Sequence, residues 1–110
     1  MRQGDIWFAD LDPTKGSEQA GRRPVVIISG DTMHQTLPIA IVVPLSSKLK
    51  AYPASTLLRP NATNGLRKDT YALPFQIRTL ANTRFRKKIG SVTQNELREI
   101  LRGLFIVLTH

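Results

Sequence analysis

Hydrophobic residues form short runs separated by turn-forming residues over most of the chain, and they recur at helical spacing only near the C-terminus. The short runs are rich in β-branched side chains, which is typical of strands. Six strands are therefore predicted, over residues 6–8, 25–29, 39–44, 54–58, 69–77 and 89–92. The 39–44 run is apolar at every position, which predicts a central strand. Pro74 lacks an amide hydrogen, so the 69–77 strand must place it at an edge or bulge.

The spacing of hydrophobic residues changes from that of strands to that of a helix after residue 92. Thr93 and Glu96 have the spacing of a capping box, which predicts the start of a helix. Five apolar residues follow on one helical face: Leu97, Ile100, Leu101, Leu104 and Leu108. Gly103 should weaken this helix by about 1 kcal/mol relative to alanine. A helical turn is also predicted around 32–36. The pattern favours a mainly β fold with a C-terminal α-helix, built as a small, strongly curved β-barrel.

Length and composition limit what this chain can be. At 110 residues we expect one domain over residues 1–110, because two halves would each be too small to bury a core. There is no cysteine, and two histidines alone cannot make a zinc site. No stretch approaches the roughly 20 apolar residues of a membrane span, and no signal peptide opens the chain. We therefore expect a cytoplasmic protein without contact with a membrane.

Positive charge gathers in the second half of the chain. Residues 1–58 hold six Lys/Arg and five Asp/Glu, whereas residues 59–110 hold ten and three. The second half therefore carries +7 of the net +8. A basic cluster with one aromatic side chain lies within it, at residues 84–88. Such an excess suits a polyanion, most commonly nucleic acid, although a solubilising surface remains the alternative.

The loop before the second strand holds candidate chemistry. Two glycines bracket it, and it ends in Arg22 and Arg23 directly before Pro24. Pro24 biases Arg23 towards an extended conformation, so a guanidinium should stand at the start of a buried strand. That is a suitable place to hold an anion. The alternative is a pair of solvated arginines with no further role.

Four segments together resemble the start of the MazF/PemK family of toxin ribonucleases. They are Gly-Asp-Ile-Trp-Phe at 4–8, Asp-Leu-Asp-Pro at 10–13, Gly-Ser-Glu-Gln at 16–19, and Gly-Arg-Arg-Pro-Val-Val-Ile-Ile-Ser at 21–29. The resemblance implies a Src-homology-3-like barrel of the PemK/MazF type. It also implies a sequence-specific endoribonuclease that cleaves single-stranded RNA without metal or another cofactor, through attack by the 2′-hydroxyl. A homodimer and an acidic MazE-like antitoxin are its implied partners.

The resemblance also assigns catalytic residues. Arg23 occupies the position of the family's catalytic arginine, and Ser46 aligns with a threonine that follows the third strand. Such cleavage needs an oriented phosphate and stabilised oxygens rather than a protein nucleophile. An arginine fork matches phosphate geometry, and serine keeps the hydroxyl donor of threonine. Glu18 is the third catalytic candidate, as a proton acceptor or as the residue that orients Arg23.

Further residues are candidates for contacts with RNA. They are Gln19, Arg22, Ser47, Lys48, Gln76, Arg78 and Arg86. Phe75 stands where many relatives carry an aspartate. It could stack a base, but a phenylalanine within a strand is more often in the core, so the core is expected. The carboxylates do not predict a metal site, and His34 has no obvious partners for a Ser–His–Asp triad. Two alternatives stay open: a non-catalytic nucleic-acid-binding module, and a relative that poisons gyrase.

Overall fold

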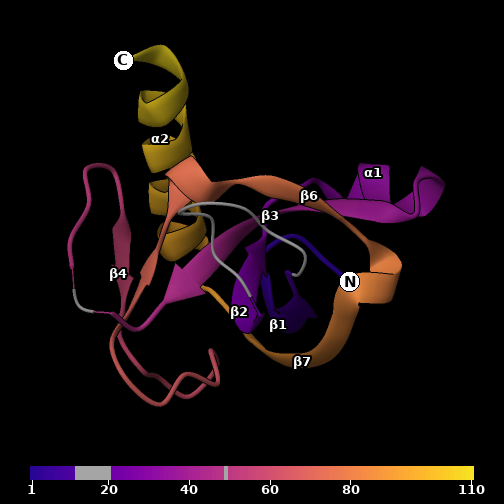
Figure 1. Cartoon of the computed structure of the whole chain (residues 1–110), viewed down its shortest axis with the longest axis horizontal. Coiled ribbons are helices and arrows are strands. Elements are labelled where there is room, and N and C mark those ends of the chain that lie inside the picture. The colour runs from indigo at the N-terminus through magenta and orange to yellow at the C-terminus, as the bar shows by residue number, and fades with distance from the viewer. Residues whose placement is uncertain (12–20, 49) are drawn as a thin grey trace.

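The computed structural model describes residues 1–11, 21–48 and 50–110. The chain forms a sheet of short strands with a long helix at its C-terminal end (Figure 1). The strands are β1 (Asp5–Asp10), β2 (Arg22–Ile27), β3 (Ile39–Ser46), β4 (Thr56–Leu58), β5 (Thr70–Ala72), β6 (Arg78–Ala81) and β7 (Phe85–Ser91). The helices are α1 (Asp31–Thr36) and α2 (Gln94–Thr109), with 3₁₀ turns η1 (Pro74–Gln76) and η2 (Asn82–Arg84). Among the described residues, no helix is long and apolar enough to cross a membrane.

Strand β3 is the centre of the sheet, as its continuous apolar run predicts. All pairings are antiparallel, in the order β4-β5-β3-β2-β1-β7, and β6 also pairs with β3. One edge of β3 is shared, because β6 pairs with its first half and β5 with its end. Within the described residues the pairings do not join β4 to β7. The expected mainly β fold is confirmed, but the sheet is open rather than a closed barrel.

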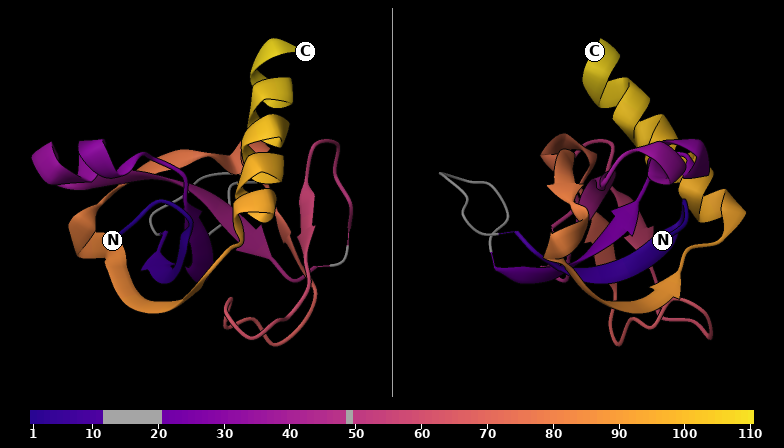
Figure 2. Two further views of the ribbon diagram at one scale, coloured as in Figure 1. Left: turned by 180° about the vertical axis from the view of Figure 1, so that it is seen from behind. Right: turned by 90° about the vertical axis from the view of Figure 1, so that its right-hand side faces the viewer.

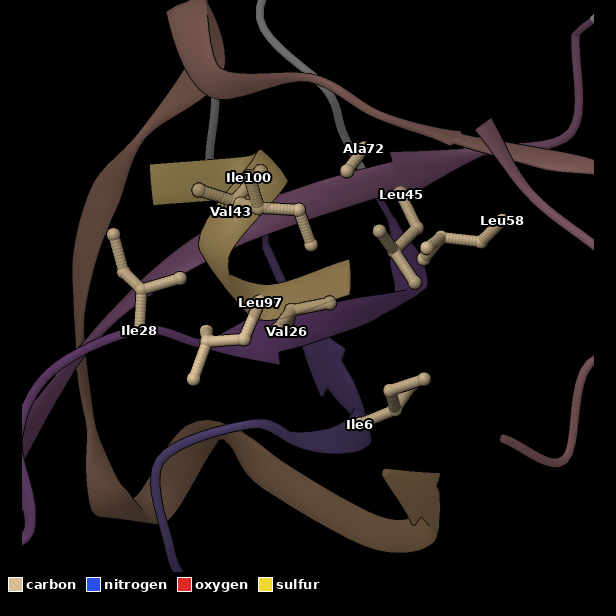
Figure 3. Packing of buried hydrophobic residues seen from close by; sticks show 9 residues of the cluster. All are labelled: Ile6, Val26, Ile28, Val43, Leu45, Leu58, Ala72, Leu97 and Ile100. Atoms are coloured by element: carbon tan, nitrogen blue, oxygen red, sulfur yellow. The ribbon is translucent and has the colours of Figure 1, made fainter. Parts of the chain in front are cut away.

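The curved sheet carries hydrophobic clusters on both faces. One face packs against α2, whose Leu97 and Ile100 lie among side chains of β2 and β3 such as Val26 and Val43 (Figure 3). The other cluster includes Val25, Ile27, Val42 and Leu80. Alternate residues of β2 thus enter opposite clusters, as the two-residue period of a strand requires. A short chain buries apolar surface on both sides of one sheet in this way.

The capping box predicted for α2 is present. The Thr93 side chain accepts from the Glu96 amide at 3.1 Å, and Glu96 Oε1 accepts from the Thr93 amide at 2.8 Å. Of the predicted apolar stripe, Leu97 and Ile100 are buried, whereas Leu108 is 70% exposed. The helix rises away from the sheet towards its C-terminus, which explains the exposed end of the stripe (Figure 2).

Three sequence expectations for residues 69–92 are wrong. The predicted 69–77 strand is two structures, because β5 stops at Ala72 and Pro74 begins η1. A proline without an amide hydrogen starts a 3₁₀ turn more easily than it continues a ladder. Phe75, expected in the core, is 41% exposed and packs edge-on against Tyr52. The last strand begins at Phe85 rather than 89, so most of the basic cluster belongs to β7.

Candidate functional site

A cleft of about 580 Å³ opens between strands β1 and β7 and the segment that leads into β5. Four cationic side chains line it, namely Arg67, Lys68, Lys87 and Lys88. No carboxylate is among the described residues that line it. Lys88 Nζ also lies 3.3 Å from Oδ1 of the buried Asp5, so part of its charge is offset. The cleft is therefore a positively charged groove, of the kind that attracts a polyanion.

A buried asparagine builds the loop wall of the cleft. Asn64 is fully buried, and its Oδ1 accepts from the amides of Asn61 at 3.2 Å and Leu66 at 3.0 Å. Its Nδ2 donates to the Arg59 carbonyl at 2.8 Å. These bonds fix the turn that sequence reasoning predicts at residues 63–65, in the loop at the lower left of Figure 1.

Two glycines let this loop lie directly on β7. A Cβ at Gly90 would lie 2.4 Å from the Thr63 carbonyl oxygen, and Gly65 has a φ of +68°. The Ser91 amide donates to that Thr63 oxygen at 2.9 Å. Only residues without a side chain permit such an approach of two backbones. Because the wall is held to β7, Arg67 and Lys68 line the same cleft as Lys87.

The floor of the cleft includes Phe8 and Pro24. Phe8 of β1 is opposite Pro24 of β2 on one side and Lys87 of β7 on the other. The β1–β7 register shifts on both sides of this part of β1, between Ile6 and Trp7 and between Phe8 and Ala9. Such bulges increase local twist and re-aim side chains, and they are frequent beside functional sites.

The predicted catalytic residues Arg23 and Ser46 stand beside this cleft. In the β2–β3 register Val25 is opposite Pro44, and continuing it by two residues sets Arg23 level with Ser46. Their neighbours Pro24 and Ser47 line the cleft. Because side chains alternate along a strand, Arg23 and Ser46 begin on the opposite face of the sheet from Pro24 and Ser47. The extended register thus sets the backbones of the pair level with each other, next to residues that line the cleft.

The Ser46 hydroxyl is positioned by the backbone after it. Ser46 is 5% exposed, and its Oγ accepts from the Lys48 amide at 3.2 Å. A hydroxyl that accepts one hydrogen bond still has its own hydrogen to donate. Ser47 and Lys48 are exposed next to it. The end of β3 therefore holds a hydroxyl donor, Ser46, two residues before a cationic side chain, Lys48.

A second group of predicted residues gathers at the end of β1. Arg78 Nη1 donates to the Leu11 carbonyl at 3.1 Å, and Arg84 Nη1 donates to the Asp10 carbonyl at 3.2 Å. Arg86 Nη2 lies 3.7 Å from Asp10 Oδ2, and Arg22 is opposite Asp10 in the β1–β2 register. Arg78 and Arg86 thus bind the chain at the end of β1, in addition to any contact that they make with RNA.

The remaining predicted residues are more scattered. Gln76 is the last residue of η1 and is not among the residues that line the cleft. Glu18 and Gln19 lie outside the described residues. Sequence reasoning missed Phe8, Arg67 and Lys68 as members of one site. The turn-forming residues at 63–65 and the cations that follow them could be seen in the sequence. The contact of this loop with β7 could not, because it depends on the fold.

His34 has partners that its sequence context did not indicate. Its Nε2 is hydrogen-bonded to Ser29 Oγ, and its Nδ1 lies 3.9 Å from Asp31 Oδ1. The three residue types match a hydrolase triad, but Ser29 is buried and its Oγ accepts from the Ile41 amide at 3.0 Å. The arrangement ties α1 to β3. Among the described residues no group of three or more His, Cys, Asp or Glu could hold a metal ion.

Comparison with known proteins agrees with the fold and with the sequence motifs. The family model described as a PemK-like, MazF-like toxin of type II toxin–antitoxin systems matches residues 2–108. Endoribonuclease MazF9 of Mycobacterium tuberculosis is 40% identical over 94% of this chain and 92% of its own length. Endoribonuclease MazF of Staphylococcus saprophyticus is 36% identical over 98% of this chain and 91% of its own.

Solved structures show the same architecture. MazF from Deinococcus radiodurans superposes with a TM-score of 0.84 at 21% identity, over 100% of this chain and 97% of that one. A mycobacterial endoribonuclease in complex with its cognate antitoxin gives a TM-score of 0.80 at 19% identity, over 98% and 94%. The chain belongs to the PemK-like, MazF-like family of toxins of type II toxin–antitoxin systems.

Proposed function

We propose that this chain is a toxin that cleaves single-stranded RNA at specific sequences, by attack of the RNA's own 2′-hydroxyl and without a metal ion. The observation that carries the proposal is the cationic cleft, beside which Arg23 and Ser46 stand level at the ends of β2 and β3. Two relatives more than a third identical to this chain are named endoribonucleases, which supports the same reaction.

The cleft residues suggest how the substrate is held. Arg67, Lys68 and Lys87 can track the phosphates of a single strand across the floor formed by Phe8 and Pro24. A phosphate that reaches the rim of the cleft then meets Arg23. The guanidinium fork binds two of its oxygens, and the Ser46 hydroxyl donates to one of them.

The reaction follows from this arrangement. The 2′-oxygen attacks the adjacent phosphorus, and the bond from phosphorus to the 5′-oxygen of the next nucleotide breaks. The products are a 2′,3′-cyclic phosphate and a 5′-hydroxyl. A general base, for which Glu18 is our candidate, takes the 2′-hydroxyl proton, and the leaving oxygen gains a proton. Arg23 stabilises the charge that grows on the phosphate oxygens in the transition state.

The same cleft suits the second expected partner. A MazF from D. radiodurans is known in complex with MazE. We propose that an acidic antitoxin of the MazE type occupies the cationic cleft of this chain and blocks the entry of RNA. We further propose that the toxin acts as a homodimer of one-domain chains in the cytoplasm. Charge complementarity favours both the RNA and the antitoxin, so the two should compete.

The first prediction concerns the chemistry. Purified protein incubated with a long RNA in EDTA should cleave it, and end mapping should find 2′,3′-cyclic phosphates and 5′-hydroxyls. RNA with a 2′-deoxy nucleotide before the cut should resist, because the attacking group is missing. Loss of activity in EDTA, or cleavage of the deoxy substrate, contradicts the mechanism. RNA binding without any cleavage favours the non-catalytic nucleic-acid-binding module. Inhibition of gyrase without RNA binding or cleavage favours a relative that poisons gyrase.

The second prediction concerns the cleft cations. The double variant Arg67→Ala, Lys87→Ala removes two of them, so log affinity for single-stranded RNA should depend less steeply on log salt. The slope should become shallower by about 1.4, since each phosphate contact in a single strand contributes roughly 0.7. Arg98→Ala, Arg102→Ala is the matched control, because it removes two exposed charges from α2. Equal slopes in the two double variants would remove the cleft from the RNA path.

A further inference from the structure

We propose that Phe8 is a stacking platform for one RNA base, in the nucleotide next to the phosphate that is cut. This inference rests on the proposed ribonuclease function and assigns a role to a residue outside the predicted site. Phe8 is 39% exposed, although it lies in β1 between strands β2 and β7. Ile6 and Ala9 of the same strand are fully buried.

Phe8 is exposed because it lies beyond the part of the sheet that α2 covers. Ile6 and Val26 belong to the cluster that packs under α2. Phe8 and Pro24 lie two residues further along the same strands, so they continue that face of the sheet. There α2 no longer covers it, and the face becomes the floor of the cleft. The cleft thus has an apolar floor between cationic walls.

That combination matches a nucleotide better than a phosphate alone. A cleft that bound only phosphate would gain nothing from an exposed aromatic ring on its floor. A nucleotide presents a flat base joined to an anionic phosphate, so it needs a stacking surface next to a cation. Phe8 supplies the ring, and Lys87, its partner across the β1–β7 register, supplies the charge.

Register also places the stacked base relative to the reaction. Phe8 is opposite Pro24, and Pro24 directly follows Arg23. Consecutive Cα atoms are about 3.8 Å apart, so the backbone opposite Phe8 is one residue along β2 from the proposed phosphate-binding arginine, and the two side chains begin on opposite faces of the sheet. An RNA strand that passes over the rim of the cleft from one face to the other would set the base on Phe8 in a nucleotide adjacent to the phosphate at Arg23.

Phe75 provides a contrast of equal exposure. It is 41% exposed, but it packs against Tyr52 at 5.1 Å between ring centroids and borders a separate apolar pocket with Ile106 and Val107. None of the four cations of the cleft lines that pocket. Phe75→Ala is therefore a matched control, because it removes an exposed ring outside the cleft.

The experiment measures binding of a labelled oligonucleotide that carries the mapped cleavage sequence, made uncleavable by a 2′-deoxy nucleotide. Phe8→Leu should weaken binding roughly tenfold, the scale of losing one base–aromatic stack, while Phe8→Tyr and Phe75→Ala stay close to the wild type. Thermal melting checks that each variant is folded. Because tyrosine keeps the ring, its result tests stacking even where leucine disturbs the sheet.

An abasic oligonucleotide completes the test. Removing the base next to the cut should weaken wild-type binding by the same factor, and Phe8→Leu should then cost nothing more. Equal affinities of Phe8→Leu and wild type, or losses that simply multiply, overturn the stacking role. Wild-type protein that neither binds nor cleaves RNA overturns the proposed function instead, so the two failures are distinguishable.

Discussion

Arg23→Lys should lower the rate of RNA cleavage by about 10²-fold or more while RNA affinity changes little. Lysine keeps the positive charge but lacks the planar fork, so two phosphate oxygens can no longer be bound together. A loss of this size is typical when one preorganised donor to the transition state is removed. Most of the electrostatic attraction remains, because the cations of the cleft are untouched. Single-turnover cleavage and binding to an uncleavable oligonucleotide measure the two quantities separately.

Arg22→Lys is the control for this prediction. Arg22 is exposed and opposite Asp10, whereas Arg23 is partly buried and opposite Ala9, so neighbouring arginines occupy different environments. The Arg22 substitution should change cleavage by less than a few fold. Similar mild effects at both positions would mean that the two arginines only attract RNA, and the catalytic role of Arg23 would be withdrawn.

The parts of the fold that depend on local chemistry could be predicted from the sequence. The capping box at Thr93 and Glu96 forms with both of its hydrogen bonds, because its residues lie only three apart. The apolar run that begins at Ile39 is the central strand, because a strand whose two faces both enter hydrophobic clusters requires apolar residues at successive positions. The helical turn at 32–36 is also present, as α1.

Features set by contacts distant in sequence could not be predicted. Pro74 could lie in a bulged strand or begin a turn. Which of the two occurs depends on where the hydrogen-bonded pairing along the edge of β3 ends. Along this edge of β3 the pairing partner changes from β6 to β5 around Pro44, and η1 connects β5 to β6 in the chain. Likewise Phe75 reads as a core residue until Tyr52, more than twenty positions earlier in the chain, is placed beside it.

The candidate site divides in the same way. Arg23 and Ser46 are candidates from the sequence alone, because each lies in a short segment that can be compared with the family's pattern. The cleft beside them needs the loop held by Asn64 to lie on β7, where Gly90 leaves space for it. No pattern of neighbouring residues indicates that contact. Arg67 and Lys68 therefore read as ordinary surface charge until the fold places them in one cleft with Lys87.

Gly103→Ala should destabilise the protein, although helix propensity alone predicts the reverse. In an isolated helix alanine is about 1 kcal/mol better than glycine. In this fold a Cβ at Gly103 would lie 2.2 Å from the Ala54 carbonyl oxygen and 3.4 Å from Pro74 Cγ. The first contact is with backbone, which cannot swing aside as a side chain would. Overpacking of this kind typically costs about 1–3 kcal/mol, which outweighs the gain in propensity.

Thermal and urea unfolding measure the difference, and Arg102→Ala is the control. Arg102 is the preceding residue of α2 and is exposed, so its substitution should change stability by no more than about 0.5 kcal/mol. Gly103→Ala should lower the midpoint of thermal unfolding by several degrees, since about 1 kcal/mol corresponds to roughly 4–8 °C in a domain near this size. A raised midpoint would mean that propensity decides, and that α2 does not lie against the backbone at Ala54. The sign of the shift therefore tests the packing of the helix directly.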